Sequence, residues 1–165
     1  MYRLFELLET IDVNSALYVF GMSMLPIVEL RGGIPLGATL GLPWVSNYII
    51  CVLGNMLPVP FILLFVKAVF QWLKKINKIR PMIEKLEKRI MSKKGQIEKY
   101  ELLGLMLFVA IPLPGTGAWT GSAIAAFLHM DNLKSFLVTL AGVLIAGLVM
   151  SGISYGFISF LDFLK

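Results

Sequence analysis

Two long stretches almost free of charge constrain this chain more than any other feature. Residues 45–66 carry no charged side chain, and residues 133–161 carry only Lys134, at their start. A transmembrane helix needs about 20 apolar residues, so each stretch is long enough to cross a bilayer. The whole chain agrees, because 58% of its 165 residues are hydrophobic and 15% are charged, against about 25% charged residues in an average soluble domain. We therefore predict an all-α integral membrane protein with a single domain.

Each long stretch follows a shorter apolar segment that ends at a proline. Residues 15–25 and 102–111 have helical character, but about ten helical residues rise only about 15 Å, half of a hydrocarbon core about 30 Å thick. Each segment then turns through glycine and proline into a second short apolar arm, at 34–42 or 122–130. This pattern predicts two re-entrant helical hairpins, each followed by a transmembrane helix. The alternative, in which both hairpin regions cross the membrane fully, gives four crossings and parallel repeats.

The two hairpin-plus-helix units align with each other without a gap at an offset of 88 residues. The matched positions are Pro26 with Pro114, Gly33 with Gly121, Gly54 with Gly142, Phe20 with Phe108, Leu25 with Leu113, and Ala38 with Ala126. Such matches are common in apolar sequence, but here they coincide with matching units, as in transporters built from internal repeats. We predict an interfacial helix at 1–13, one repeat at 14–66, a connector at 67–99 and a second repeat at 100–165.

The connector sets the predicted orientation. Eleven of the 15 lysines and arginines lie between Lys67 and Lys99, and short loops rich in these residues stay in the cytoplasm. The first long helix then runs inward and the second outward, so the repeats are inverted about the plane of the inner (plasma) membrane. Within the connector, the spacing of apolar residues predicts a short amphipathic helix. Topology and contact with anionic membrane lipids account for the net charge of +5, so we expect no nucleic-acid partner.

The first predicted tip carries two charges. Glu29 and Arg31 stand in the apolar segment "VELRGGIPLG", at a depth where charges are costly and functional by default. Residues two apart do not share a helix face, so these side chains need an unwound segment to meet. A buried Glu29 suits a proton carrier, and Arg31, which keeps its charge, suits the binding of an anion. A pair that only caps a broken helix is the structural alternative.

The second predicted tip, "IPLPGTGAWTG" at 111–121, offers backbone amides, two hydroxyls and an indole N–H. Helix N-termini attract anions through such amides, and two tips that meet near the midplane would form a polar site. Asn55, in a kink predicted at Pro58 and Pro60, either lines this site or satisfies carbonyls that proline leaves free. The predicted binding residues are Glu29, Arg31, Gly32, Gly33, Asn55, Pro114, Gly115, Thr116, Gly117, Trp119 and Thr120.

Other chemistries find little support in the sequence. Cys51 is the only cysteine, and His129, expected in a loop at the interface, is the only histidine, so we predict no metal site and no disulfide. The sequence has no phosphate-binding Gly-Lys-Ser/Thr loop, zinc-helix signature or Gly-x-Ser-x-Gly elbow. We therefore expect neither a cofactor nor enzymatic activity. The small residues between positions 142 and 156 predict close helix packing.

Both tips resemble a known family. "ELRGGIPLG" at 29–37 and "IPLPGTGAWTG" at 111–121 are similar to the paired signatures of the putative small multidrug export protein family, and the resemblance covers almost the whole chain. It implies a small membrane transporter. The layout also resembles, more distantly, the DedA and SNARE-associated Golgi (VTT) superfamily, which implies inverted re-entrant hairpins and the movement of lipids between leaflets. The acidic residue of that superfamily's first hairpin would correspond to Glu29, whereas the arginine of its second hairpin has no counterpart beside Thr116.

These observations predict a secondary transporter or lipid translocase with a midplane site between the two hairpins. Its substrate would be an anionic lipid or a polyprenyl-phosphate carrier, moved with proton coupling. One alternative is a proton-coupled exporter of small cationic drugs, in which Glu29 faces an aromatic-lined cavity. Another is a membrane scaffold that transports nothing and tolerates the loss of Glu29. A single copy with two full spans encloses little volume, so we expect a homodimer among membrane lipids.

Overall fold

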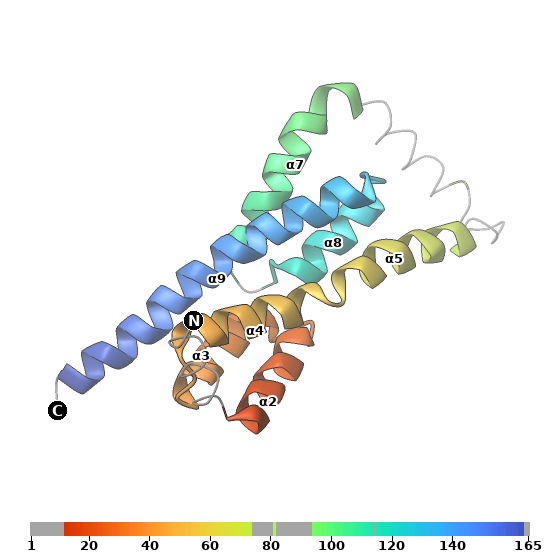
Figure 1. Ribbon diagram of the computed structural model, residues 1–165. Helices are drawn as coiled ribbons and strands as arrows, with labels where there is room; N and C mark the ends of the chain where they lie inside the picture. Colours follow the sequence, from red (N-terminus) through yellow and green to blue (C-terminus); the bar gives the residue numbers. More distant parts are fainter. Residues whose placement is uncertain (1–11, 74–80, 82–93, 114, 164–165) are drawn as a thin grey trace, which may run out of the picture.

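The part of the chain that the structure describes consists of helices joined by short turns and loops. A computed structural model places residues 12–73, 81, 94–113 and 115–163. No strand occurs among them, which confirms the predicted all-α class. The predicted interfacial helix at 1–13 and the amphipathic part of the connector lie largely outside the described residues. The helices are α2 (Val13–Met24), α3 (Glu29–Thr39), α4 (Trp44–Met56), α5 (Val59–Leu73), α7 (Lys94–Ala110), α8 (Ala118–Phe127) and α9 (Asn132–Phe163) (Figure 1).

Two long apolar segments form the body of the molecule. One is α9, and the other is α4 with α5, which are separated at Leu57 and Pro58. Both segments are long and apolar enough to cross a membrane, judged by length and composition. The separation confirms the predicted kink, because proline lacks the N–H that a continuous helix would use. Figure 1 shows the two segments running in opposite directions, and α9 contacts both α4 and α5.

A pair of shorter helices precedes each long segment. A turn at 25–28 joins α2 to α3, and the described residues between α7 and α8, 111–113 and 115–117, are irregular. α2 and α3 both pack on α4, whereas α7 and α8 both contact α9. A Cβ added at Gly54 would lie 2.6 Å from a backbone carbonyl oxygen of α2, and one added at Gly142 would lie 2.8 Å from a carbonyl oxygen of α7. Glycine at these two positions therefore lets each long segment lie directly against the first helix of its pair.

The second helix of each pair begins earlier than the sequence suggested. α3 begins at Glu29 rather than at residue 34, and α8 begins at Ala118 rather than at residue 122. Gly32 and Gly33 consequently lie inside a helix, and their prediction as turn residues was wrong. A Cβ on Gly33 would overlap the hydroxyl of Ser23. This glycine therefore serves the packing of α3 on α2 rather than a reversal of the chain.

Local geometry repeats at the offset of 88 residues. α3 and α8 end at residues 39 and 127, and α4 and α9 begin at residues 44 and 132. The loops between them use equivalent hydrogen bonds and equivalent residues with positive φ, and His129 lies in such a loop, as predicted. The equivalent features are Leu42 N to Gly37 O (3.0 Å) with Met130 N to Ala125 O (3.0 Å), Gly41 N to Ala38 O (3.1 Å) with His129 N to Ala126 O (3.2 Å), and the positive φ of Gly41 (78°) with that of His129 (54°).

The two helix pairs lie toward opposite ends of the body. The second helix of each pair also contacts the long segment of the other half. Figure 1 shows α2 and α3 near the beginning of α4, and α8 beside α5. α3 contacts α9, and α8 contacts α5, so the second helix of each pair packs on the long segment of the other half. This exchange of contacts brings the tips of the two pairs together.

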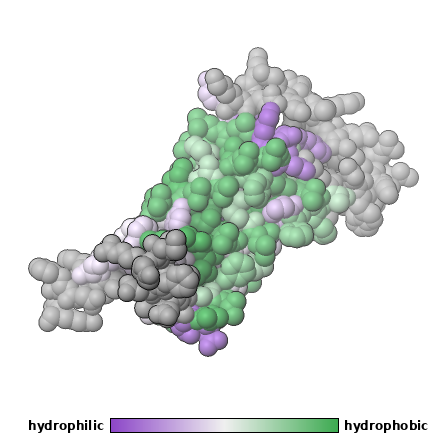
Figure 2. All heavy atoms as spheres, viewed as in Figure 1, coloured by the Kyte–Doolittle hydropathy of each residue, from purple (hydrophilic) through white to green (hydrophobic). Residues whose placement is uncertain are grey.

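The outer surface is largely apolar. Figure 2 shows hydrophobic residues over most of the visible face, with hydrophilic residues gathered mainly toward its two ends. Large apolar side chains such as Phe61 and Phe65 are each 69% exposed. Exposed apolar surface of this extent is typical of a protein that faces lipid.

Candidate functional site at the helix-pair tips

Glu29 and Arg31 form an ion pair at the beginning of α3. Nη1 of Arg31 donates to Oε2 of Glu29 at 3.1 Å, although residues two apart on a regular helix point in different directions. Glu29 has a positive φ of 49°, and this irregular residue turns its side chain back toward Arg31. The pair therefore meets within the first turn of α3, where one irregular residue takes the place of the predicted unwound segment. The carboxylate is buried, since Glu29 is only 3% exposed.

The other oxygen of the Glu29 carboxylate reaches the second helix pair. The backbone N–H of Trp119, in the first turn of α8, donates to Oε1 at 3.0 Å. A carboxylate is stabilised there, because the first amides of a helix lack partners within it and the helix dipole is positive at this end. Gly117, with φ of 144°, precedes α8, and a Cβ added to it would overlap this carboxylate. Glycine is therefore required under the ion pair.

Arg31 reaches the end of α7 with its other terminal nitrogen. Nη2 donates to the carbonyl oxygens of Val109 at 3.3 Å and Ile111 at 3.1 Å, and to Oγ1 of Thr116 at 3.0 Å. The Thr116 hydroxyl lies 2.9 Å from the carbonyl oxygens of Ile111 and Leu113. The last carbonyls of a helix lack partners within it and favour a cation. Arg31 consequently caps α7 while Glu29 caps α8.

Trp119 makes the reciprocal contact with the first helix pair. Its indole Nε1 donates to the carbonyl oxygen of Met24, the last residue of α2, at 3.0 Å. Trp119 also stands 88 residues after Arg31, so equivalent positions in the two halves each cap a helix end of the other half. We call Glu29, Arg31, Thr116 and Trp119 the tip junction.

The ion pair at the tip junction joins a buried Glu29 to a partly buried Arg31, and it is well supplied with hydrogen bonds. Pairing and hydrogen bonding offset the desolvation of two charges only when the geometry is good. Both carboxylate oxygens of Glu29 and both terminal nitrogens of Arg31 have partners, whereas the buried Nε of Arg31 has none. Removal of one charge would leave the other buried without its partner, which typically costs about 3–5 kcal/mol.

The structure places the remaining predicted residues in different surroundings. Gly115 has a positive φ of 80° and open space around it, and the exposed Thr120 lies in the first turn of α8 with its hydroxyl 3.5 Å from the Gly117 carbonyl oxygen. Asn55 is buried in α4, one residue before the helix ends, and its Oδ1 has no hydrogen-bond partner. Pro114 lies outside the described residues.

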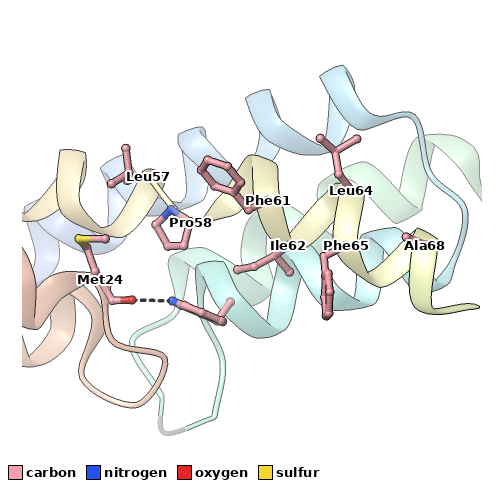
Figure 3. A pocket seen from close by; sticks show the side chains of 9 residues that line it. Met24, Leu57, Pro58, Phe61, Ile62, Leu64, Phe65 and Ala68 are labelled. Atoms are coloured by element: carbon pink, nitrogen blue, oxygen red, sulfur yellow. Dashed lines mark hydrogen bonds between the residues drawn. The ribbon is translucent and has the colours of Figure 1, made fainter.

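An apolar groove adjoins the tip junction and was not predicted. Its volume is about 610 Å³, and Trp119 lines it as well as belonging to the junction. Figure 3 shows that its other lining side chains come from Met24, the α4–α5 break and α5. The prolines at 58 and 60 predicted the break between α4 and α5. The sequence could not show that Trp119, from the other half, lies beside this break. The lining residues are Met24, Leu57, Pro58, Phe61, Ile62, Leu64, Phe65, Ala68 and Trp119.

A second buried polar contact lies away from the tips. Nδ2 of Asn47 donates to the Ile34 carbonyl oxygen at 2.8 Å and to the Tyr155 hydroxyl at 2.9 Å. The Tyr155 hydroxyl donates to the Leu42 carbonyl oxygen at 2.6 Å. These bonds tie α3, α4 and α9 together. Sequence reasoning missed them because Asn47 and Tyr155 are 108 residues apart.

The long apolar helices and the apolar surface define the class of the chain as a membrane protein. Over residues 29–149 its sequence matches the family described as putative small multi-drug export protein. The match covers well over half of the chain, so the chain belongs to this family, and the predicted resemblance is confirmed. No curated protein and no solved structure matches the chain. The more distant resemblance to the DedA and VTT superfamily stays a prediction.

Proposed function

We propose that the chain is a small transporter of the inner membrane whose substrate passes the tip junction. The observation that carries this proposal is the Glu29–Arg31 pair, a buried carboxylate and a partly buried guanidinium where the helix pairs meet, each bonded to the other pair. The family description supports transport in general. Within this proposal the chain transports and does not catalyse, with neither metal nor cofactor.

In the proposed architecture the two halves are inverted re-entrant repeats. The equivalent loops at an offset of 88 and the opposite directions of α4–α5 and α9 support it. α2 and α3 then enter and leave the membrane from outside. α7 and α8 enter and leave from the cytoplasm, where the basic connector at 67–99 lies. The tip junction lies near the midplane, as substrate sites do in transporters with broken helices.

Arg31 is held by more hydrogen-bond partners than Glu29, and this difference favours an anionic substrate. Arg31 has four partners, namely Glu29, two carbonyl oxygens and Thr116, whereas Glu29 has three, Arg31 and the backbone amides of Trp119 and Ala118. Arg31 also keeps its charge, whereas a proton can neutralise a carboxylate. Protonation of Glu29 would free a guanidinium and a helix N-terminal amide for an anion. Proton binding and anion binding are therefore coupled at this site.

The apolar groove suits the rest of such a substrate. Its lining residues are apolar, and it meets the tip junction at Trp119. A molecule with an anionic head and an apolar tail could place the head at Arg31 and the tail along α5. The substrate class is thus an anionic lipid or a polyprenyl-phosphate carrier that enters sideways from the bilayer.

A second candidate is the export of cationic drugs. The family description favours it, and so does the groove, because Phe61, Phe65 and Trp119 offer aromatic rings to a cation. A cation would have to replace Arg31 beside Glu29. It would compete with a guanidinium that has four partners, which makes this the less favoured candidate.

We also propose that two copies associate through α9. Gly142 and Gly147 pack against other helices of the same chain, whereas Gly152 and Gly156 face open space. Two glycines at this spacing allow close contact between membrane helices. A homodimer would enlarge the volume that each copy encloses.

Transport by the purified protein in liposomes tests the proposed function. Vesicles would contain a fluorescent anionic lipid or a cationic dye, with a pH gradient, and folding would be followed separately by thermal unfolding. We expect flux of the anionic lipid, lost in Glu29→Gln, in Arg31→Gln and in the double variant, while each variant still folds and inserts. Lys134→Gln, which removes an exposed charge on α9, is the matched control and should keep full flux.

Three outcomes would contradict this proposal. Flux of the cationic dye alone would support the second candidate. Normal flux in the double variant would show that the two charges only cap helices. Absence of flux for both compounds in the unmodified protein would favour a scaffold.

A further inference from the structure

Of the four buried hydroxyl groups without a hydrogen-bond partner in the described part of the second half, three are fully buried. Ser122 on α8 and Ser135 and Thr139 on α9 are each 0% exposed, and their hydroxyl oxygens have no partner. Serine and threonine inside helices commonly donate to a carbonyl of their own preceding turn. None of these three does so, which leaves all three hydroxyls available to another group.

The internal repeat indicates that the three hydroxyls lie together. At the offset of 88 they correspond to Ile34, Asn47 and Cys51, and the helices that carry both sets share their bounds and loop hydrogen bonds. In the first half, Nδ2 of Asn47 donates to the Ile34 carbonyl oxygen at 2.8 Å, and Sγ of Cys51 lies 3.4 Å from Oδ1 of Asn47. By this equivalence the backbone of Ser122 lies beside the side chain of Ser135 where α8 packs on α9, and Thr139 follows one turn later on the same face of α9.

The two halves have different side chains where the second helix of each pair packs on its long segment. In the first half a Cβ on Gly37 would overlap the amide of Asn47. In the second half the corresponding residues are Ala125 and Ser135, so a methyl group stands near the place of the amide. Ser122 also replaces the bulkier Ile34. At these two positions the second half therefore carries smaller side chains than the first.

We propose that Ser122, Ser135 and Thr139 together hold one buried water molecule that links α8 to α9. Buried waters in proteins typically make two to four hydrogen bonds to polar groups that otherwise lack partners, and three hydroxyls match this requirement. Three neutral hydroxyls supply no negative charge for a metal cation, so the ligand is water. This inference is independent of the proposed transport.

The link has a consequence for motion. The side chain of Asn47 ties α3 to α4 directly, whereas an exchangeable water molecule ties α8 to α9. We therefore expect α8 to separate from α9 more readily than α3 separates from α4.

A double-mutant cycle tests whether the hydroxyls share a ligand. Ser122→Ala and Thr139→Val each remove one partner of the water, and we expect each to lower the midpoint of thermal unfolding by about 2–4 °C. The combined variant should fall no further than the larger single effect, because the water is already lost. The control is Ser151→Ala, which removes another buried, unpartnered hydroxyl of α9, and its effect should add to that of Thr139→Val.

Water-edited NMR of the protein in bilayers provides a second measurement. We expect transfer of magnetisation from water to Thr139, and loss of this transfer in Ser122→Ala. Additive midpoints for Ser122→Ala and Thr139→Val would overturn the proposal. Transfer to Thr139 that is unchanged in Ser122→Ala would overturn it as well.

Discussion

At the scale of single residues, Gly115 and Gly117 show how differently two neighbouring glycines can be constrained. Both have positive φ, at 80° and 144°. A Cβ on Gly115 would meet nothing within 4 Å, whereas a Cβ on Gly117 would overlap the Glu29 carboxylate and lie 2.5 Å from Nη1 of Arg31. Any residue with a side chain would have a strained backbone at both positions, but only at Gly117 would the side chain also meet the ion pair.

Alanine substitutions at these two glycines should therefore differ in effect. Gly115→Ala should lower the free energy of unfolding by about 1 kcal/mol through backbone strain. Gly117→Ala should lower it by a further 1–3 kcal/mol or so, because the ion pair must move. Unfolding of the detergent-solubilised protein measures both. If both substitutions lower the free energy of unfolding equally, the ion pair does not depend on the absence of a side chain at Gly117.

Asp12 gives a pH-dependent prediction at the beginning of α2. The Ser15 hydroxyl donates to its carboxylate at 2.6 Å, and the amides of Ser15 and Asn14 donate at 3.0 and 3.3 Å. These donors, the Ser15 hydroxyl above all, lower the pKa of Asp12 below its ordinary value of 3.8. A lowered pKa in the folded state means that the cap stabilises α2 above pH 3.8 and is lost as the pH falls through the folded value.

Hydrogen exchange of the first amides of α2 measures this loss. Between about pH 5 and about pH 2.5, after correction for the intrinsic pH dependence of exchange, protection of the Ser15 amide should fall in the unmodified protein. Asp12→Ser keeps a capping oxygen that does not titrate in this range. Its protection should stay constant, and an equal fall in both proteins would rule out Asp12 as the cause.

At the scale of helices, the sequence predicted those features that depend on residues close together in the chain, namely the long helices and the break between α4 and α5. Charge-free length predicted α9 and the α4–α5 segment, and Pro58 predicted the break between α4 and α5. The beginning of α3 was misplaced, because Gly33 looks like a turn residue until Ser23 packs against it. The capping of α7 and α8 by Arg31 and Glu29 could not be read from sequence either, since it joins residues from opposite halves.

The contact between α3 and α4 yields a prediction with a built-in rescue. Gly37→Ala should displace the Asn47 amide, break its bonds to Ile34 and Tyr155, and lower the free energy of unfolding by about 1–3 kcal/mol. Adding Asn47→Ser should restore part of the loss, because alanine and serine already occupy the equivalent positions of the second half. Chemical unfolding of the single and double variants measures the coupling. Purely additive losses would argue against equivalent packing in the two halves.

At the scale of the whole molecule, the two halves depend on each other through the tip junction and the exchange of α3 and α8. Each helix pair is capped by side chains of the other pair, and each second helix packs on the long segment of the other half. We therefore expect that neither half keeps its tip geometry alone. The tips can share one site at the midplane only if both pairs are re-entrant and enter from opposite faces.

The accessibility of single cysteines on the two sides of the membrane tests this inverted arrangement most directly. In a Cys51→Ala background, the four exposed positions Val13, Trp44, Tyr100 and Leu133 would be changed to cysteine one at a time. A maleimide that cannot cross the membrane would be applied to intact cells and to inside-out vesicles. We expect Val13→Cys and Trp44→Cys to react only from outside, and Tyr100→Cys and Leu133→Cys only from the cytoplasmic side. Reaction of Val13→Cys and Trp44→Cys from opposite faces would show that the first helix pair crosses the membrane, and would contradict the inverted arrangement.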